Sequence, residues 1–98
     1  MDVFQCIASR RSVRTFLREP LPADTIERIA EAVRWAPSWA NTQCVQLVAV
    51  QLPERISQLA ELLSERNPAR QAFDVAPLVM VLCARRGLAG HKKGQPVT

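Results

Sequence analysis

Glycine is scarce in this 98-residue chain, and its distribution excludes one class of ligand site. The three glycines, Gly87, Gly90 and Gly94, all lie near the C-terminal end. No glycine-rich turn elsewhere can wrap a phosphate with backbone N–H groups, so neither a Walker A loop nor a G-x-G-x-x-G turn is available. A phosphate bound by the body of the chain must therefore be held largely by side chains.

Histidine, cysteine and long apolar runs are scarce as well. The only histidine, His91, lies in the tail, which excludes a histidine-rich metal site or a Ser-His-Asp triad in the rest of the chain. Cys6, Cys44 and Cys83 form an odd set without C-x-x-C spacing, so we expect no disulfide framework and a cytoplasmic location. No apolar run approaches the roughly 18 residues that span a bilayer, and no signal peptide is apparent, so no membrane association is expected.

An arginine cluster near the N-terminus is the best candidate for binding a phosphate. The apolar pattern of residues 3–8 predicts a short helix that ends near Ser9, after which the sequence continues Arg-Arg-Ser-Val-Arg. If residues 10–14 are extended, Arg10, Ser12 and Arg14 point to the same face. Two guanidinium groups and a hydroxyl on one face suit a phosphate monoester dianion. The alternative is a solvated basic stretch at a helix end, where the helix dipole favours cations.

A longer amphipathic helix is predicted from Pro22 to Ala36. Pro22 suits the first turn of a helix and Asp24 suits its positive N-terminal end. Pro37 disfavours helical geometry at Ala36, so the helix is expected to stop there. Its predicted buried stripe has i, i+3, i+4, i+7 spacing and consists of Ile26, Ile29, Ala30 and Val33.

The segment after this helix collects polar side chains in a single turn. Ser38, Asn41 and Gln43 stand in a loop at the edge of a predicted strand, a common place for ligand contacts. One hydroxyl and two carboxamides in one turn suit a planar, hydrogen-bonding ligand. The alternative is that Ser38 and Asn41 only satisfy the helix end and the turn.

Two near-continuous apolar runs, residues 44–50 and 77–84, predict strands that are covered on both faces. Between them Pro53 opens a predicted helix, with Glu54, Glu61 and Glu65 on its outer face. Its predicted buried stripe consists of Ile56, Leu59, Ala60 and Leu63. Two buried strands need a third strand or a partner to make a stable sheet, so we expect the front half of a larger unit.

Taken together, these segments resemble the FMN-dependent nitroreductase family. The pattern I-x-x-R-R-S-V-R-x-F occupies residues 7–16, and A-P-S-x-x-N-x-Q occupies residues 36–43 before an apolar strand. The order and separation of the two motifs match those of the family, and the likeness extends to the strand that ends near Ala84. The resemblance implies an α+β fold with a central, largely antiparallel sheet flanked by helices, here truncated to roughly its first half, in an intertwined dimer.

The resemblance also implies a cofactor site and a reaction. The positions that bind the phosphate and ribityl chain of FMN correspond to Arg10, Ser12 and Arg14, with Arg11 adjacent. The segment that reaches the flavin from the partner subunit of a homodimer corresponds to Pro37, Ser38, Trp39 and Asn41. Such enzymes take electrons from NADH or NADPH and pass them to nitroaromatics, quinones or similar small-molecule acceptors. FMN carries the chemistry, so no catalytic side chain and no metal is expected.

The chain departs from the family pattern in three places. Cys44 stands where members usually have proline, which affects entry to the strand rather than a ligand atom. Many members place an Asn and a Lys before the second strand to contact the flavin. The corresponding stretch here runs from Asn67 to Gln71, so Asn67, Arg70 or Gln71 could substitute. Family proteins are also considerably longer, and their later half supplies further strands, helices and flavin contacts.

Our hypothesis divides the chain into residues 1–84, the N-terminal portion of an FMN-binding domain, and residues 85–98, a basic glycine-containing loop or end. The predicted function is an NAD(P)H-dependent FMN oxidoreductase. The first alternative is a non-enzymatic basic module that uses its net charge of +4 to bind nucleic-acid phosphates. Tyrosine is absent and aromatics make up only 5%, which does not favour a base-stacking nucleic acid platform. The second alternative is an inactive fragment of a flavoprotein.

Overall fold

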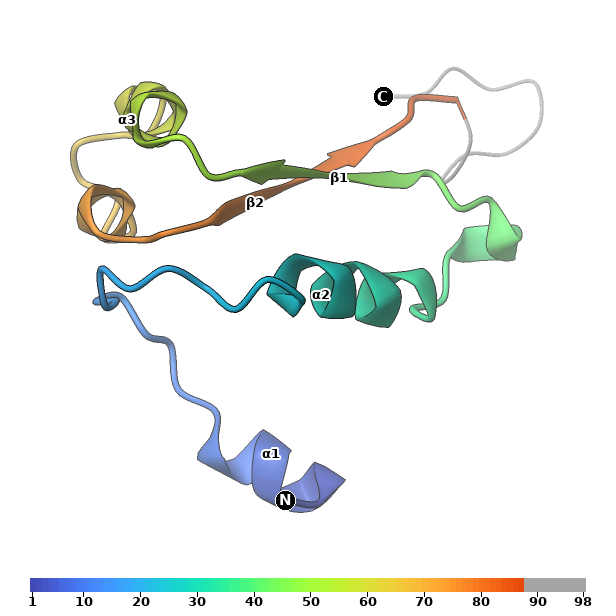
Figure 1. Ribbon diagram of the computed structural model, residues 1–98. Helices are drawn as coiled ribbons and strands as arrows, with labels where there is room; N and C mark the ends of the chain where they lie inside the picture. The colour runs from blue at the N-terminus through green and yellow to red at the C-terminus, as the bar shows by residue number, and fades with distance from the viewer. Residues whose placement is uncertain (88–98) are drawn as a thin grey trace.

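The computed structural model describes residues 1–87 and combines three α-helices with a two-stranded antiparallel sheet, as expected of an α+β fold (Figure 1). In chain order the elements are α1 (Val3–Ser9), α2 (Thr25–Arg34), the 3-10 helix η1 (Trp39–Asn41), β1 (Val45–Val50), α3 (Pro53–Glu61), the 3-10 helix η2 (Arg70–Asp74) and β2 (Val79–Ala84). The predictions for residues 88–98, including His91, Gly90 and Gly94, lie outside the described residues.

The sheet is a pair of strands, β1 and β2, whose register runs from Val45 opposite Ala84 to Val50 opposite Val79. The backbone N–H of Arg85 donates to the carbonyl of Cys44 at 2.9 Å, which extends the ladder by one step. Both predicted strands are therefore confirmed, with starts one or two residues later. The expectation that they are covered on both faces is not met by the described residues, because side chains such as Leu82 remain 67% exposed.

The small core lies where α3 packs against η2. Ile56 and Ala60 on α3 and Ala72 on η2 are the buried apolar residues of the described chain. Pro53 occupies the first turn of α3, where its missing N–H costs nothing. The predicted apolar stripe on α3 does face the core through Ile56 and Ala60. Leu59 is only half-buried, and Leu63 lies beyond the end of the helix.

The second helix is shorter than predicted and less covered. Its first residue is Thr25, because Pro22 instead contributes its carbonyl to a turn that accepts the Thr25 N–H at 3.0 Å. It ends at Arg34, two residues before Ala36, whose N–H still donates to the carbonyl of Val33. The predicted buried stripe is only partly covered, since no residue of α2 is fully buried and Ala30 is exposed.

The molecule is open rather than compact. Its radius of gyration is 16.5 Å, against about 13 Å for a compact domain of 100 residues. Its accessible surface of 8806 Å² also exceeds the roughly 5,600 Å² expected for a compact monomer of 11.0 kDa. In Figure 1 α1 stands apart from the other elements, and its Phe4 is 83% exposed. Apolar faces of this chain are therefore left without a covering layer.

Candidate functional site

The arginine cluster follows α1 as an extended segment, as the sequence predicts. Arg10, with φ −58° and ψ 134°, ends the helix and starts this segment. The Nη1 of Arg10 donates to the Oγ of Ser12 at 3.4 Å, so the structure brings these two predicted site residues together. A serine hydroxyl that accepts one hydrogen bond keeps its own proton to donate, so this pair offers N–H and O–H donors to one anion.

Arg11 is engaged differently from its neighbours. Its Nη1 donates to the carbonyl of Ala8 at 3.1 Å and to that of Arg10 at 2.8 Å. These contacts satisfy carbonyls at the C-terminal end of α1, where a cation is also favoured by the helix dipole. Arg11 thus makes the helix-end interaction that the sequence left open as an alternative.

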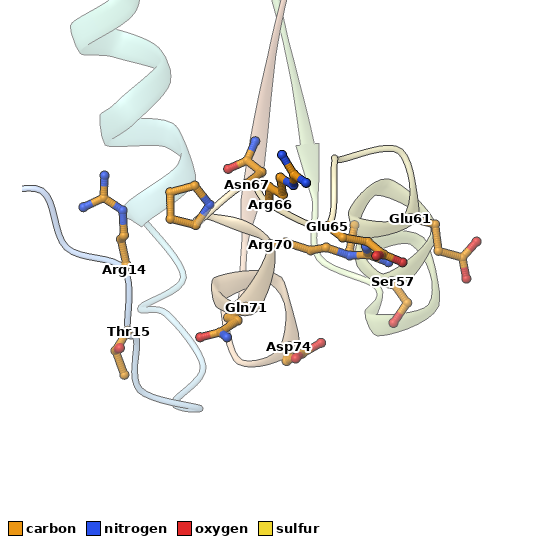
Figure 2. A pocket seen from close by; sticks show the side chains of 12 residues that line it. Arg14, Thr15, Ser57, Glu61, Glu65, Arg66, Asn67, Arg70, Gln71 and Asp74 are labelled. Carbon is orange, nitrogen blue, oxygen red and sulfur yellow. The ribbon is translucent and has the colours of Figure 1, made fainter.

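Arg14 lines a cavity of about 750 Å³ between the extended segment, α3 and η2. Figure 2 shows Arg14 and Thr15 on the extended segment at one side of the cavity, with residues of the turn before η2 and of η2 lying between that segment and α3. The opposite walls consist of Ser57, Ala60, Glu61, Glu65, Arg66, Asn67, Pro68, Arg70, Gln71 and Asp74. Arg10 and Ser12 precede this cavity along the chain and are not among its lining residues.

The turn before η2 is held by the side chain of Asn67. Its Oδ1 accepts the backbone N–H of Ala69 at 2.9 Å, and its carbonyl accepts the N–H of Arg70 at 3.1 Å. This is an Asx turn, in which a short polar side chain substitutes for a backbone hydrogen bond. It fixes the start of η2 and hence the positions from which Arg70 and Gln71 enter the cavity.

Three of the cavity's charged residues, Glu61, Glu65 and Asp74, were not predicted as site residues. The lining also contains three arginines, Arg14, Arg66 and Arg70, so it carries equal numbers of each sign. The sequence did contain a signal, because Ser57, Glu61 and Glu65 recur every four residues on the polar face of the predicted helix. That periodicity marks a polar face but does not distinguish a cavity wall from a face in open solvent.

The second motif forms a strained turn between α2 and β1. Ala40, Asn41 and Gln43 have φ values of 50°, 54° and 51°, in the left-handed region. For residues other than glycine this conformation costs roughly 1–2 kcal/mol each, although asparagine tolerates it better. The Oγ of Ser38 accepts the Gln43 N–H at 3.0 Å, and the Ser38 carbonyl accepts the Asn41 N–H at 3.0 Å.

This turn borders a second cavity, of about 890 Å³, at the start of β1. The Nε2 of Gln43 donates to the Oδ1 of Asn41 at 3.2 Å, which ties the two carboxamides together. Between them, the Oγ1 of Thr42 is buried without a hydrogen-bond partner among the described residues. The lining residues are Val33, Arg34, Trp35, Ala36, Pro37, Ser38, Asn41, Gln43, Val45 and Leu82. Trp39 opens η1, and its side chain lies outside the described part of the structure.

The two cavities lie at opposite ends of the β1–β2 pair. The strained turn leads directly into Val45 at one end, whereas α3 follows Val50 and η2 precedes Val79 at the other (Figure 1). A strand of six residues spans on the order of 17–20 Å. Within one chain, therefore, the structure does not bring the arginine segment and the Ser38–Gln43 turn together.

Two other kinds of site receive no support in residues 1–87. No group of three or more His, Cys, Asp or Glu side chains there is arranged to hold a metal ion. None of the helices in this part of the chain has the length and apolar character needed to cross a membrane. The three cysteines are free thiols, with Cys6 and Cys83 exposed and Cys44 half-buried.

Comparison with known proteins places these features in a family. The sequence model of the nitroreductase family matches residues 7–91. The FMN reductase [NAD(P)H] of Bacillus subtilis (strain 168) is 32% identical over 83 residues, which is 85% of this chain and 32% of that protein. Iodotyrosine deiodinase 1 of Rattus norvegicus is 30% identical over 66 residues, which is 67% of this chain and 23% of that protein. The chain thus spans a third or less of these relatives.

Two solved structures share the fold. A nitroreductase family protein from Clostridium novyi NT superposes with a TM-score of 0.85 at 21% identity, over 99% of this chain and 55% of that one. The hypothetical oxidoreductase YcnD from Bacillus subtilis gives a TM-score of 0.69 at 33% identity, over 86% of this chain and 32% of that one. The predicted nitroreductase-like α+β fold is therefore confirmed, and the chain belongs to the nitroreductase family.

Proposed function

We propose that this chain forms the N-terminal part of an FMN-dependent oxidoreductase that uses NADH or NADPH. One observation carries the proposal: Arg14, from the predicted phosphate segment, shares a cavity with Asn67, Arg70 and Gln71, the candidates for contacting the flavin ring. These residues come from segments far apart in the sequence. The name of the Bacillus subtilis relative, FMN reductase [NAD(P)H], supports the same cofactor and electron donor.

The residues of this end of the molecule fit the chemical groups of FMN. Guanidinium and hydroxyl donors for a phosphate dianion come from Arg10, Ser12 and Arg14. These side chains take the place of a glycine-rich loop, which the body of the chain lacks. The cavity volume of about 750 Å³ lies within the range of cofactor sites. Because the Oδ1 of Asn67 is occupied by the Ala69 N–H, its amide group is left to donate to a ligand.

The role of the protein in such a reaction is to bind and orient the cofactor. When bound, FMN would supply the redox chemistry of hydride transfer from the nicotinamide and electron transfer to an acceptor such as a nitroaromatic or a quinone. Arg70 lines the cavity with a permanent positive charge, which would favour states of a bound ring with greater negative charge where it lies nearer to the ring than the three carboxylates of the lining do. Asn67 holds the turn from which Arg70 projects, so it contributes to the placement of that charge.

The complete site in this proposal is shared by two copies of the chain. Pro37, Ser38 and Asn41 line a cavity at the end of the sheet opposite to Arg14, so one chain does not place both halves around one ligand. In a homodimer, one copy would supply Arg14 and the other would supply the Ser38–Gln43 turn, so that both halves surround one ligand. The homodimer would also cover some of the apolar surface that the open chain exposes.

The visible absorbance spectrum of the purified chain tests this function. The protein is mixed with FMN, passed through a desalting column and then given NADH or NADPH without oxygen. We expect a retained flavin spectrum that bleaches on addition of the nicotinamide. A folded protein that retains no flavin contradicts the proposal, and binding of a DNA oligonucleotide with steep salt dependence would favour the basic binding module instead.

A further inference from the structure

We infer that Ser38 is a positioning residue, whose hydroxyl holds the Ser38–Gln43 turn in its strained conformation rather than contacting a ligand. The inference rests on the proposed function, because the turn is the part of the FMN site contributed to the partner copy. The resemblance assigned Ser38 to cofactor binding. In the structure its Oγ already accepts the Gln43 N–H at 3.0 Å, across five residues of the turn.

The turn needs such a restraint because its backbone is costly. Ala40 and Gln43 adopt positive φ values, 50° and 51°, without being glycine or asparagine. In the left-handed region the Cβ of such residues crowds the following carbonyl oxygen. Conformations of this kind persist only where surrounding contacts enforce them. The hydrogen bonds from the Gln43 N–H to the Ser38 Oγ and from the Asn41 N–H to the Ser38 carbonyl both span Ala40, and the first also holds the backbone nitrogen of Gln43.

The strained conformation of the turn brings two carboxamide side chains together at the cavity. With the turn closed, the Gln43 Nε2 donates to the Asn41 Oδ1 at 3.2 Å, and both side chains line the cavity. This pairing leaves the amide group of Asn41 as a free donor and the Oε1 of Gln43 as a free acceptor. A planar ligand whose ring edge carries both a carbonyl and an N–H, as the flavin ring does, is complementary to that pair. Gln43 thereby joins Asn41 as a specificity-determining residue.

Four variants separate positioning from direct contact. Ser38→Ala removes the hydroxyl, and we expect it to weaken FMN binding about three- to tenfold, the range typical of one lost hydrogen bond. Ser38→Thr keeps a hydroxyl and should restore binding. Adding Ala40→Gly to Ser38→Ala should also restore much of it, because glycine adopts positive φ without strain. Adding Ala23→Gly to Ser38→Ala is the matched control, since it introduces a glycine into an exposed turn where φ is not positive and that lines neither cavity.

Two readouts make the result decisive. FMN affinity is measured by quenching of flavin fluorescence, and hydrogen exchange of the Gln43 amide is measured by NMR without FMN. We expect fast Gln43 exchange in Ser38→Ala and slow exchange in the wild type and in Ser38→Thr. If Ala40→Gly fails to restore FMN affinity, or if Gln43 exchange is the same in Ser38→Ala and wild type, the inference is wrong. A wild-type chain with slow Gln43 exchange that binds no FMN instead contradicts the proposed function.

Discussion

Neighbouring arginines in the N-terminal segment have different surroundings, although the sequence presents them as one basic cluster. Arg11 contacts carbonyls at the end of α1, Arg10 contacts Ser12, and Arg14 lines the cavity with Asn67 and Arg70. Alternation along an extended backbone separates Arg11 from Arg10 and Arg14. Arg10 differs from Arg14 because it precedes the cavity along the chain. Arg14 is therefore the residue whose charge should matter most for an anionic ligand in the cavity.

Reversing that charge gives the first prediction. Arg14→Glu places a carboxylate against the proposed FMN phosphate, and we expect FMN affinity to fall by at least about 100-fold, equivalent to roughly 2.7 kcal/mol. Fluorescence titration with FMN measures the change. Arg28→Glu serves as the control, because Arg28 is exposed on α2 and lines neither cavity. Equal FMN affinity in the two variants would remove Arg14 from the site.

Thr42 gives a second prediction at the same scale. Its Oγ1 is buried without a partner, a state that costs desolvation without the return of a hydrogen bond. Thr42→Val replaces the hydroxyl with a methyl group of similar size, so we expect the free energy of unfolding to stay the same or rise by about 1 kcal/mol. Urea denaturation measures this. A loss of more than about 1 kcal/mol would show that the hydroxyl has a partner in solution.

At the scale of elements, α3 and η2 form the packed unit on which the cavity is built. Ile56 is 3% exposed and contributes to the buried core together with Ala60 and Ala72. The same helix carries Ser57 and Glu61 on the face that lines the cavity. Packing of the apolar face thus sets the position of the polar one, and loss of the core should affect ligand binding indirectly.

A matched pair of truncations tests this packing. Ile56→Ala leaves a cavity in the core, and we expect it to lower the free energy of unfolding by about 2–4 kcal/mol. Leu62→Ala removes a side chain that is 81% exposed, so its effect should stay within about 0.5 kcal/mol. Thermal and urea unfolding of both variants provide the comparison. Similar losses for the two would mean that the buried position of Ile56 is not maintained in solution.

The sequence predicted the positions of the helices and strands better than it predicted which segments pack against them. Apolar runs and proline positions predicted both strands and the start of α3, because these signals act locally. The start of α2 was placed too early, since Pro22 suits a turn as well as a first helical turn. Periodicity also predicted the apolar faces of α2 and the sheet, but it carries no information on their partners, and the described residues leave them largely uncovered. The common cavity of Arg14, Asn67 and Arg70 was expected only from the family resemblance, since local sequence patterns do not show how distant segments fold together.

At the scale of the whole molecule, the proposed site requires the two ends of one sheet to contact two different ligand molecules. The cavity at Arg14 and the cavity at Ser38 each contain part of the predicted flavin environment. The radius of gyration of 16.5 Å and the exposed apolar faces fit a chain that is completed by further polypeptide. In the proposed homodimer a second copy would supply the missing half of the site, so flavin binding would require the dimer.

Gel filtration with light scattering and simultaneous flavin absorbance tests this claim most directly. After incubation of the chain with FMN, we predict a peak with the mass of two chains that carries flavin in an amount close to one per chain. The Arg14→Glu variant should keep the dimer mass and lose the flavin. A monomeric peak that retains flavin would contradict the shared site, and a wild-type dimer without flavin would contradict the assignment of FMN.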